Sequence, residues 1–438
     1  MKSRMLAWIG VISVFTLLAM PVRVLAQEQQ QQAQHLSHYI VTDLGTLGGT
    51  FSIAFGINDR GQIDGFSTIP GDMSTHAFVL NHGVMTDLGT LGGPNSIAGT
   101  GPNLSLQVPG LAETATLDPN GEDFCGFGTN LICLTFSWQN GVMTALDTLG
   151  GNNAQGAGIN DQGQIAGFAE NTTVDANCPA PQVLQFKPVV WTNGHIHALP
   201  LYPSDSEGAG FWINNRGEVV GASGTCAAYD GRYGVSLQPR HALLWRKGRL
   251  PIDLGNLGGS FNNAGFAINE VEQVVGASDL PGDQYQHAFL WQSGLMRDLG
   301  TLPGDVVSAA VAINNRGLIT GVSQDANGND RAFLWESGVM TDLNTLIPAN
   351  SPLYLLHCFQ INSAGEIVGL GVTSSGEIHG FLATPITGED NLEGYASSSG
   401  AGPVKVTLSE SARKQLQGWV RSRQFATASA DPQGPPSR

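Results

Sequence analysis

Asp43-Leu-Gly-Thr-Leu-Gly-Gly49 returns unchanged as Asp87-Leu-Gly-Thr-Leu-Gly-Gly93, and this phrase decides the fold of the chain. Looser copies follow as Leu146-Asp-Thr-Leu-Gly-Gly151, Leu199-Pro-Leu-Tyr202, Asp253-Leu-Gly-Asn-Leu-Gly-Gly259, Asp298-Leu-Gly-Thr-Leu-Pro-Gly304 and Asp342-Leu-Asn-Thr-Leu346. A phrase that recurs in this way indicates one supersecondary unit copied in tandem. Repetition of this kind specifies a scaffold far better than it specifies a chemistry.

A second phrase, Ala54-Phe-Gly-Ile-Asn-Asp-Arg-Gly-Gln-Ile-Asp-Gly65, predicts two short strands joined by a tight turn. Asn58 can accept hydrogen bonds from the backbone ahead, and Gly61 can take positive φ. We interpret Leu117-Asp-Pro-Asn-Gly121 as the same turn in the second repeat, and we expect a strained turn in the fifth, where Glu272 replaces the glycine. The phrase echoes at Gly158–Gly167, Ile213–Gly221, Ile313–Gly321 and Ile361–Gly369.

A third phrase, His76-Ala-Phe-Val-Leu80, follows each such hairpin and predicts a third strand. Its echoes are His241-Ala-Leu-Leu-Trp245, His287-Ala-Phe-Leu-Trp291 and Arg331-Ala-Phe-Leu-Trp335. The segment that leads into the next Asp-Leu-Gly phrase supplies a fourth strand. Four strands in about 50 residues are typical of a propeller blade.

The two ends of the repeat region indicate a closed ring. Tyr39–Leu44 is a fourth strand with no partner strands before it, and His379–Ala383 is a third strand with no fourth strand after it. An N-terminal strand that completes the last blade would remove the exposed sheet edges, whereas an open array would need distinct capping units. The sequence therefore predicts an all-β, seven-bladed β-propeller over residues 38–385, with four-stranded antiparallel blades closed by the N-terminal strand.

Glycine and tryptophan recur within the predicted blades. The second strand carries a glycine in every copy, which we assign to Gly65, Gly126, Gly167, Gly221, Gly276, Gly321 and Gly369. The third strand usually carries a tryptophan, at Trp138, Trp191, Trp245, Trp291 and Trp335. We expect each indole to pack over the bare glycine of the neighbouring strand. Solvent-facing aromatics for sugar stacking are the alternative, which is less favoured because the residue recurs with the fold.

These phrases resemble the HAF-repeat family of bacterial extracellular proteins, which is named for the tripeptide found here at His76–Phe78 and His287–Phe289. The resemblance spans the repeat region and implies export and a repeat fold. It implies no agreed activity and no catalytic residues. The second repeat departs from the pattern with an insertion around Gly101–Ala115, and the third and fourth repeats carry long loops.

The segments before and after the repeats predict an N-terminal signal peptide and a C-terminal tail. Lys2 and Arg4 precede an apolar run that Pro21 ends, so residues 1–26 are expected to be a cleaved secretory signal peptide. We expect residues 27–37 to form a polar, disordered lead. After the propeller we expect a Gly/Ser-rich linker over 386–404, a short amphipathic helix over 405–425 and a disordered tail over 426–438. An uncleaved membrane anchor is the alternative at the N-terminus, but the apolar run is short for it.

The net charge limits which partners the chain can bind, and the cysteine content indicates the compartment in which it works. The formal charge of −16 falls to about −19 once the three positive charges of the leader are removed, so nucleic acid is not an expected partner. Five cysteines in an exported chain indicate disulfides. We expect Cys125–Cys133, flanking a hairpin of the second repeat, and Cys178–Cys226 in neighbouring loops, with Cys358 a buried free thiol.

Variable loops on a rigid ring are where propellers bind ligands. The face that carries the loops between second and third strands collects the insertions Asn171–Val183 and Gly224–Pro239, and we also place Gly101–Ala115 there. The candidate binding residues on this face are Asp175, Tyr229, Asp230, Arg232 and Tyr233. Loops that merely cover a neighbouring blade are an equally open interpretation.

Metal chemistry is not expected. The third-strand histidines His76, His241, His287 and His379 occupy equivalent places on separate blades, so structural hydrogen bonding is favoured over a shared ion. Asp325–Asp330 is rich in oxygen, as a calcium loop is, but lacks a bidentate glutamate at the required distance, which favours a polar turn. We therefore expect no metal and no cofactor, with calcium at this loop as the weaker alternative.

No nucleophile elbow, zinc-protease motif, phosphate loop or dinucleotide fingerprint is present in the sequence, and no catalytic residue is assigned. The favoured function is a secreted or periplasmic, monomeric binding module for an unknown polymer, glycan or protein, without a transmembrane span after signal cleavage. The alternative is a secreted hydrolase or lyase acting on carbohydrate or another polymer, which convergent carboxylates with a His or Arg in a central funnel would favour. A purely structural envelope protein is a third interpretation.

Overall fold

The structure of the chain is a computed structural model that describes residues 38–226 and 237–386. All the strands belong to one compact unit that begins at Tyr39. The expected signal peptide, the polar lead, the linker beyond residue 386, the C-terminal helix and the tail lie outside the described residues, as do Tyr229, Asp230, Arg232 and Tyr233. Within the described ranges, no helix is long and apolar enough to cross a membrane.

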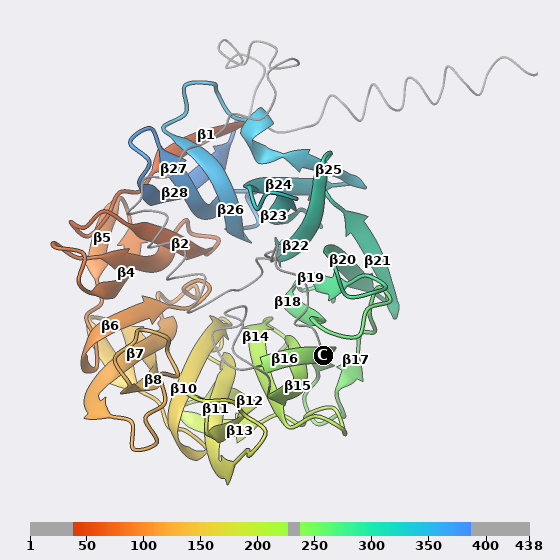
Figure 1. Cartoon of the computed structure of the whole chain (residues 1–438). Coiled ribbons are helices and arrows are strands. Elements are labelled where there is room, and N and C mark those ends of the chain that lie inside the picture. The colour runs from red at the N-terminus through yellow and green to blue at the C-terminus, as the bar shows by residue number, and fades with distance from the viewer. Residues whose placement is uncertain (1–37, 227–236, 387–438) are drawn as a thin grey trace, which may run out of the picture. The chain divides into compact units, whose positions relative to one another are not determined.

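Seven four-stranded antiparallel sheets surround a common centre, as Figure 1 shows. This is the seven-bladed β-propeller that the repeats predict. Each sheet except the last is a meander of consecutive strands, and the first strand of each blade is the innermost, as seen for β2 (Ser52–Ile57) and β14 (Glu207–Ile213) in Figure 1.

The strands follow the repeats. Blade 1 consists of β2, β3 (Ile63–Thr68), β4 (Thr75–Asn81) and β5 (Val84–Asp87); blade 2 of β6 (Gly92–Ala98), β7 (Val108–Leu117), β8 (Leu131–Gln139) and β9 (Val142–Ala145); blade 3 of β10 (Gly150–Ile159), β11 (Ile165–Val174), β12 (Leu184–Thr192) and β13 (His195–Ala198). Blade 4 consists of β14, β15 (Val219–Cys226), β16 (Leu237–Trp245) and β17 (Ile252–Asp253); blade 5 of β18 (Ala264–Ile268), β19 (Val274–Asp279), β20 (Gln286–Gln292) and β21 (Leu295–Gly300). Blade 6 consists of β22 (Asp305–Ile313), β23 (Ile319–Asp325), β24 (Asp330–Glu336) and β25 (Val339–Asp342), and the short 3-10 helix η1 (Leu343–Thr345) follows it.

The last blade is built from both ends of the repeat region. Strands β26 (Leu353–Ile361), β27 (Ile367–Thr373) and β28 (Ile378–Pro385) are joined by the N-terminal strand β1 (Tyr39–Asp43). Strand β1 pairs antiparallel with β28, from Tyr39 opposite Pro385 to Asp43 opposite Phe381. The predicted closure by an N-terminal strand is confirmed, and it covers the edge that β28 would otherwise expose.

The turn between the first and second strands of a blade, called here the inner turn, has the predicted chemistry. In blade 1, Asn58 Oδ1 accepts hydrogen bonds from the backbone N–H groups of Arg60 and Gln62, and Gly61 has φ +71°. The fifth inner turn keeps this shape although it lacks the glycine, because Glu272 itself adopts φ +62°. The expected strain at Glu272 is therefore present, since a residue with a Cβ pays for the left-handed region.

Blade 2 differs from the sequence interpretation. Its inner turn lies between β6 and β7, where Asn103 Oδ1 accepts from the N–H groups of Ser105 and Gln107. Leu117 instead ends β7 and Asp118–Gly121 begin the loop between β7 and β8, so our assignment of the turn was wrong. Gly101–Ala115 is consequently not an insertion on the loop-rich face: it holds the inner turn and most of β7. The error arose because Asp118 builds the same local turn, accepting from the N–H groups of Asn120 and Glu122.

The residue that packs over the recurring glycine also differs from the predicted tryptophan. In blade 2 that glycine is Gly110, opposite Phe136, and not Gly126. A Cβ on Gly110, Gly276, Gly321 or Gly369 would lie 2.6–3.0 Å from a phenylalanine ring of the third strand, whereas one on Gly167 would meet the ring of Trp191 at 2.9 Å. The recurring tryptophans are buried, which excludes the sugar-stacking alternative. The phenylalanine, and not the tryptophan, packs over the glycine because it lies directly opposite the glycine in the strand pairing. The tryptophan lies two residues further along, on the same face of the third strand.

The cysteines form the predicted pairs. Cys125 is linked to Cys133 and Cys178 to Cys226, while Cys358 is free and buried. Cys125 lies in the loop between β7 and β8 and Cys133 lies on β8, so this disulfide ties a long loop to the strand that follows it, where we expected it to flank a hairpin. The second disulfide joins the long loop of blade 3 to β15 of blade 4.

Candidate functional site

The asparagine of each inner turn binds the next blade. Its side-chain Nδ2 donates to the backbone oxygen of the equivalent asparagine at 3.0–3.2 Å, and the seven bonds close a ring around the axis. The members of this asparagine ring are Asn58, Asn103, Asn160, Asn214, Asn269, Asn314 and Asn362. The amide oxygens remain on their own turns, so each side chain satisfies one turn and one inter-blade contact. The repeat predicted the turn but gave no signal for the inter-blade bond.

The residues that follow the asparagines form a second, incomplete ring. In five places a side-chain oxygen accepts from the backbone N–H of the preceding blade at 2.8–2.9 Å. The acceptors are Asp161, Asn215, Glu270, Asn315 and Asp59. The series is interrupted in two places: the side chain of Leu104 carries no acceptor oxygen, and the hydroxyl of Ser363 donates to Asp59 instead of accepting. This second ring is therefore acidic and asymmetric.

The two rings line a cavity of about 180 Å³ at the axis, to which residues of all seven blades contribute. Its carboxylates are Asp59 and Asp161, which are exposed, and Glu270, which is half-buried. The first strands fill the axis nearby with aromatic rings: the centroids of Phe55 and Phe359 lie 5.1 Å apart. The cavity, called here the axial mouth, is thus a polar and acidic recess over an apolar plug.

Carboxylates accept hydrogen bonds and attract cations. The acceptors of the axial mouth hold their positions through backbone N–H groups, as a preorganised site requires. In the described ranges, no three His, Cys, Asp or Glu residues of the mouth bring their ligand atoms within 4.8 Å of one another. The mouth suits a ligand with several donor groups better than a single metal ion.

The loop-rich face holds the one candidate residue of the sequence that the structure describes, Asp175, and it is buried. It lies in the loop between β11 and β12, against Glu207, the first residue of β14. The structure does not bring the other four candidates to it, because they lie outside the described ranges. The sequence interpretation missed Glu207, which holds blade 3 to blade 4 by accepting from the N–H of Phe186 at 2.6 Å. Between other blades a serine hydroxyl accepts the equivalent backbone N–H, at Ser52, Ser96 and Ser308.

A second pair of buried carboxyls joins the long loops of blades 2 and 3. Glu122 Oε1 accepts from the N–H of Leu184, and Gln182 Nε2 bridges Glu122 and Glu170 at 3.2 and 3.1 Å. Burial, reinforced by the charge of Glu122, raises the pKa of Glu170 to about 8. Burial also raises the pKa of Glu122. Both glutamates and the amide nitrogen of Gln182 are hydrogen-bonded to protein groups, so the network acts as a clasp between the two loops.

The third-strand histidines make the predicted structural hydrogen bonds. His76, His287 and His379 bond a fourth-strand aspartate, with His379 Nδ1 at 2.9 Å from Asp43 of the closing strand. His241 instead bonds Asp205. Arg331 replaces the imidazole in blade 6 and bonds Asp342 and Asp305. Asp325 accepts from the N–H groups of Asn327 and Asn329, so the oxygen-rich loop is the predicted polar turn.

No family model matches the sequence, and no curated protein matches it. Among solved structures, the chain is similar to an acylaminoacyl peptidase from Pyrococcus horikoshii (12% identity, TM-score 0.44, covering 78% of this chain and 53% of that one). It is also similar to the β-propeller domain of the Trilobed protease from Pyrococcus furiosus (8%, 0.47, 78% and 99%) and to a lectin from Aleuria aurantia (12%, 0.32, 68% and 96%). The chain spans about half of the length of the first. At these identities the likeness is one of fold.

Proposed function

We propose that this chain is an exported binding module whose ligand site is the axial mouth. Export is supported by the N-terminal leader pattern and by two disulfides, which persist in oxidising compartments. The axial mouth is the observation that carries the proposed site: residues from all seven blades meet in one cavity, so it occurs once per molecule although the blade occurs seven times.

The ligand class follows from the lining. Asp59, Asp161 and Glu270 give the mouth negative charge, and Asn215 and Asn315 add neutral amides. A ligand that offers amine or guanidinium groups, such as a basic peptide segment, satisfies such acceptors and is attracted by the charge. A glycan offers hydroxyl donors without the charge and is the weaker candidate.

Binding is favoured over hydrolysis or elimination. Catalysis of polymer cleavage requires an acid and a base converging on one bond. The carboxylates of the mouth come from separate blades, and each accepts a hydrogen bond from a backbone N–H. Asp59, for example, accepts from the N–H of Ser363 at 2.8 Å. Such groups are arranged around a recess rather than aimed at one point.

The test is a binding screen of the mature chain against peptides of graded charge, glycans and other polymers. The matched variant is Asp59→Asn/Glu270→Gln, which removes two charges but keeps an acceptor oxygen for each backbone N–H. The control is Glu336→Gln/Glu377→Gln, which makes the same charge change outside the mouth. We expect basic peptides to bind, with at least tenfold loss in the mouth variant only, in line with about 1.5–3 kcal/mol for a charged hydrogen bond. Equal affinity of both variants would place the ligand elsewhere.

A further inference from the structure

The sequence beyond the described residues contains a basic segment, residues 405–423. Its charged residues are Lys405, Arg413, Lys414, Arg421 and Arg423, against the single acidic Glu410, so its net charge is +4. Residues 38–386, in contrast, hold 11 basic and 30 acidic residues, a net charge of −19. The basic segment is therefore attracted to the propeller, most strongly where carboxylates are accessible and cations are absent.

The chain leaves the propeller beside the axial mouth. Strand β28 ends at Pro385, and a Cβ on Gly365 would lie 3.8 Å from Cγ of this proline. Gly365 belongs to the inner turn of blade 7, where its N–H donates to Asn362 O at 3.0 Å. Asn362 and Ser363 of the same turn line the mouth. The chain that continues towards the basic segment thus starts at the rim of the mouth.

The carboxylates of the mouth have accepting capacity left for cationic side chains. A carboxylate can accept about four hydrogen bonds. In the described ranges, Asp59 accepts two, from the N–H and the hydroxyl of Ser363, and Glu270 accepts one, from the N–H of Asn215. No lysine, arginine or histidine of the described ranges lines the mouth. The inner turns carry three arginines that lie outside this lining, Arg60, Arg216 and Arg316.

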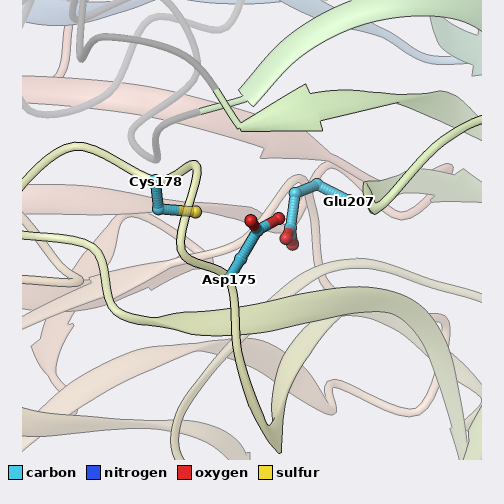
Figure 2. Close-up of side chains that lie close together, drawn as sticks. All are labelled: Asp175, Cys178 and Glu207. Atoms are coloured by element: carbon cyan, nitrogen blue, oxygen red, sulfur yellow. The ribbon is translucent and has the colours of Figure 1, made fainter.

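Two other groups of carboxyls are closed to a chain segment. Asp175 and Glu207 face each other where the long loop of blade 3 meets blade 4, as Figure 2 shows, and they are only 6% and 0% exposed. Glu122 and Glu170 of the clasp are buried in the same way. A cationic side chain reaches neither group unless the loops open, so of the three groups only the axial mouth is open to it.

We propose that the basic segment binds in the axial mouth of its own chain and thereby regulates access to it. The guanidinium and ammonium groups of the segment form charge-assisted hydrogen bonds with Asp59, Asp161 and Glu270. This inference rests on the proposed function, because it uses the same site: an external basic ligand binds there by displacing the segment.

The length of the intervening sequence makes weak contacts sufficient. A flexible, Gly/Ser-rich linker as long as residues 386–404 has a root-mean-square span of about 20–25 Å. A short flexible linker gives a tethered segment an effective concentration of about 1 mM at its site. A segment that binds with a Kd of about 0.1 mM therefore occupies the mouth about nine-tenths of the time.

The first test measures competition for the mouth in the full mature chain. The variant Arg413→Gln/Lys414→Gln/Arg421→Gln/Arg423→Gln removes four charges from the segment and keeps its length. The probe is a fluorescent synthetic peptide of residues 405–423, followed by anisotropy. We expect the peptide to bind the variant about tenfold more tightly than the natural chain, because the variant has no internal competitor. Equal affinity for the two chains would overturn the proposal.

Further substitutions in the neutralised variant locate the site of the peptide. Adding Asp59→Asn/Glu270→Gln should weaken the peptide at least about tenfold, whereas adding Glu336→Gln/Glu377→Gln should leave its affinity unchanged. The two proposals fail separately. If unrelated basic peptides bind both chains equally in a mouth-dependent way, the site stands and its occupation by the segment is overturned. If only the segment peptide responds to the mouth substitutions, the segment stands as the ligand and the external binding function is overturned.

A second test locates the segment in the full chain by cross-linking. A carbodiimide joins a lysine amine to a contacting carboxylate as an amide, with loss of water. We expect cross-links within one molecule from Lys405 or Lys414 to Asp59, Asp161 or Glu270, identified by peptide mass spectrometry and reduced at high salt. Cross-links that reach only carboxylates outside the mouth, or that form only between molecules, would overturn the proposal. So would binding of the segment to anionic lipid vesicles without any cross-link to the mouth.

Discussion

Asp64 is fully buried in the second strand of blade 1, and neither of its carboxyl oxygens has a hydrogen-bond partner of good geometry, although the N–H groups of Gly101 and Gly56 lie near them. Burial raises its pKa well above the usual range, against the weaker opposing effect of the nearby backbone of Gly101 and Gly56. A buried polar group without partners costs free energy that an apolar residue of similar size would not. The same strand position holds valine in blades 4, 5 and 7, at Val220, Val275 and Val368.

We predict that Asp64→Val raises the free energy of unfolding by about 1–3 kcal/mol, because it removes an unsatisfied polar group without creating a cavity. Urea denaturation measures the change. Asp64→Asn is the control and should bring no gain, since an amide in the same place is equally unsatisfied. A lower urea midpoint for Asp64→Val would show that this carboxyl group has a partner that the contacts do not reveal.

At the scale of elements, the clasp between the long loops of blades 2 and 3 should make the stability of the fold decrease as the pH rises from about 4.5 to about 8. Glu170 has an ordinary pKa of 4.5 when unfolded and about 8 when folded. Between these values the folded state binds more protons than the unfolded state, so stability is present below about pH 4.5 and is lost as pH rises through 8.

We therefore predict that the melting temperature falls between pH 6 and pH 8, and that Glu170→Gln flattens this slope. The glutamine keeps an oxygen for Asn153 and has no proton to lose as the pH rises. Calorimetry across the pH series measures the slope, with Glu377→Gln as the control that should retain it. A slope unchanged in Glu170→Gln would mean that another group titrates.

The asparagine ring gives a second prediction for elements. Asn314 Nδ2 donates to Asn362 O in the next blade, and Asn314 Oδ1 holds its own turn by accepting from the N–H groups of Arg316 and Leu318. Asn314→Asp keeps the acceptor of the turn, removes the inter-blade donor and places a carboxylate oxygen against the backbone oxygen of Asn362. We predict a loss of about 1–3 kcal/mol in the free energy of unfolding, measured by chemical denaturation.

The neighbouring substitution Asn315→Asp is the control for this ring. Asn315 is exposed and uses its oxygen to accept from Glu270 N–H, which an aspartate also does. It should change stability by no more than about 0.5 kcal/mol. Equal effects of the two substitutions would argue that the ring adds nothing beyond the turn.

At the scale of the whole molecule, the repeats predicted the blade count, the ring and its closure, because each phrase fixes a local strand or turn and the unpaired ends require each other. Blade 2 was misassigned because Asp118 and Asn103 make the same local turn chemistry, and local pattern does not distinguish an inner turn from a loop. The axial mouth was not predicted, since Asp59 and Glu270 come from different repeats and meet only through the ring. Glu207 was missed because nothing in its local sequence shows that it faces Asp175.

The central claim of this account is that seven repeats form one ring closed by strand β1. The most direct measurement compares the thermal unfolding of the mature chain with that of a chain beginning at Gly48, before and after addition of a synthetic peptide of residues 38–47. We predict that the shortened chain melts at a lower temperature or aggregates, because β28 loses its partner strand, and that the peptide binds it and restores stability. An unchanged melting curve together with no peptide binding would contradict closure by this strand.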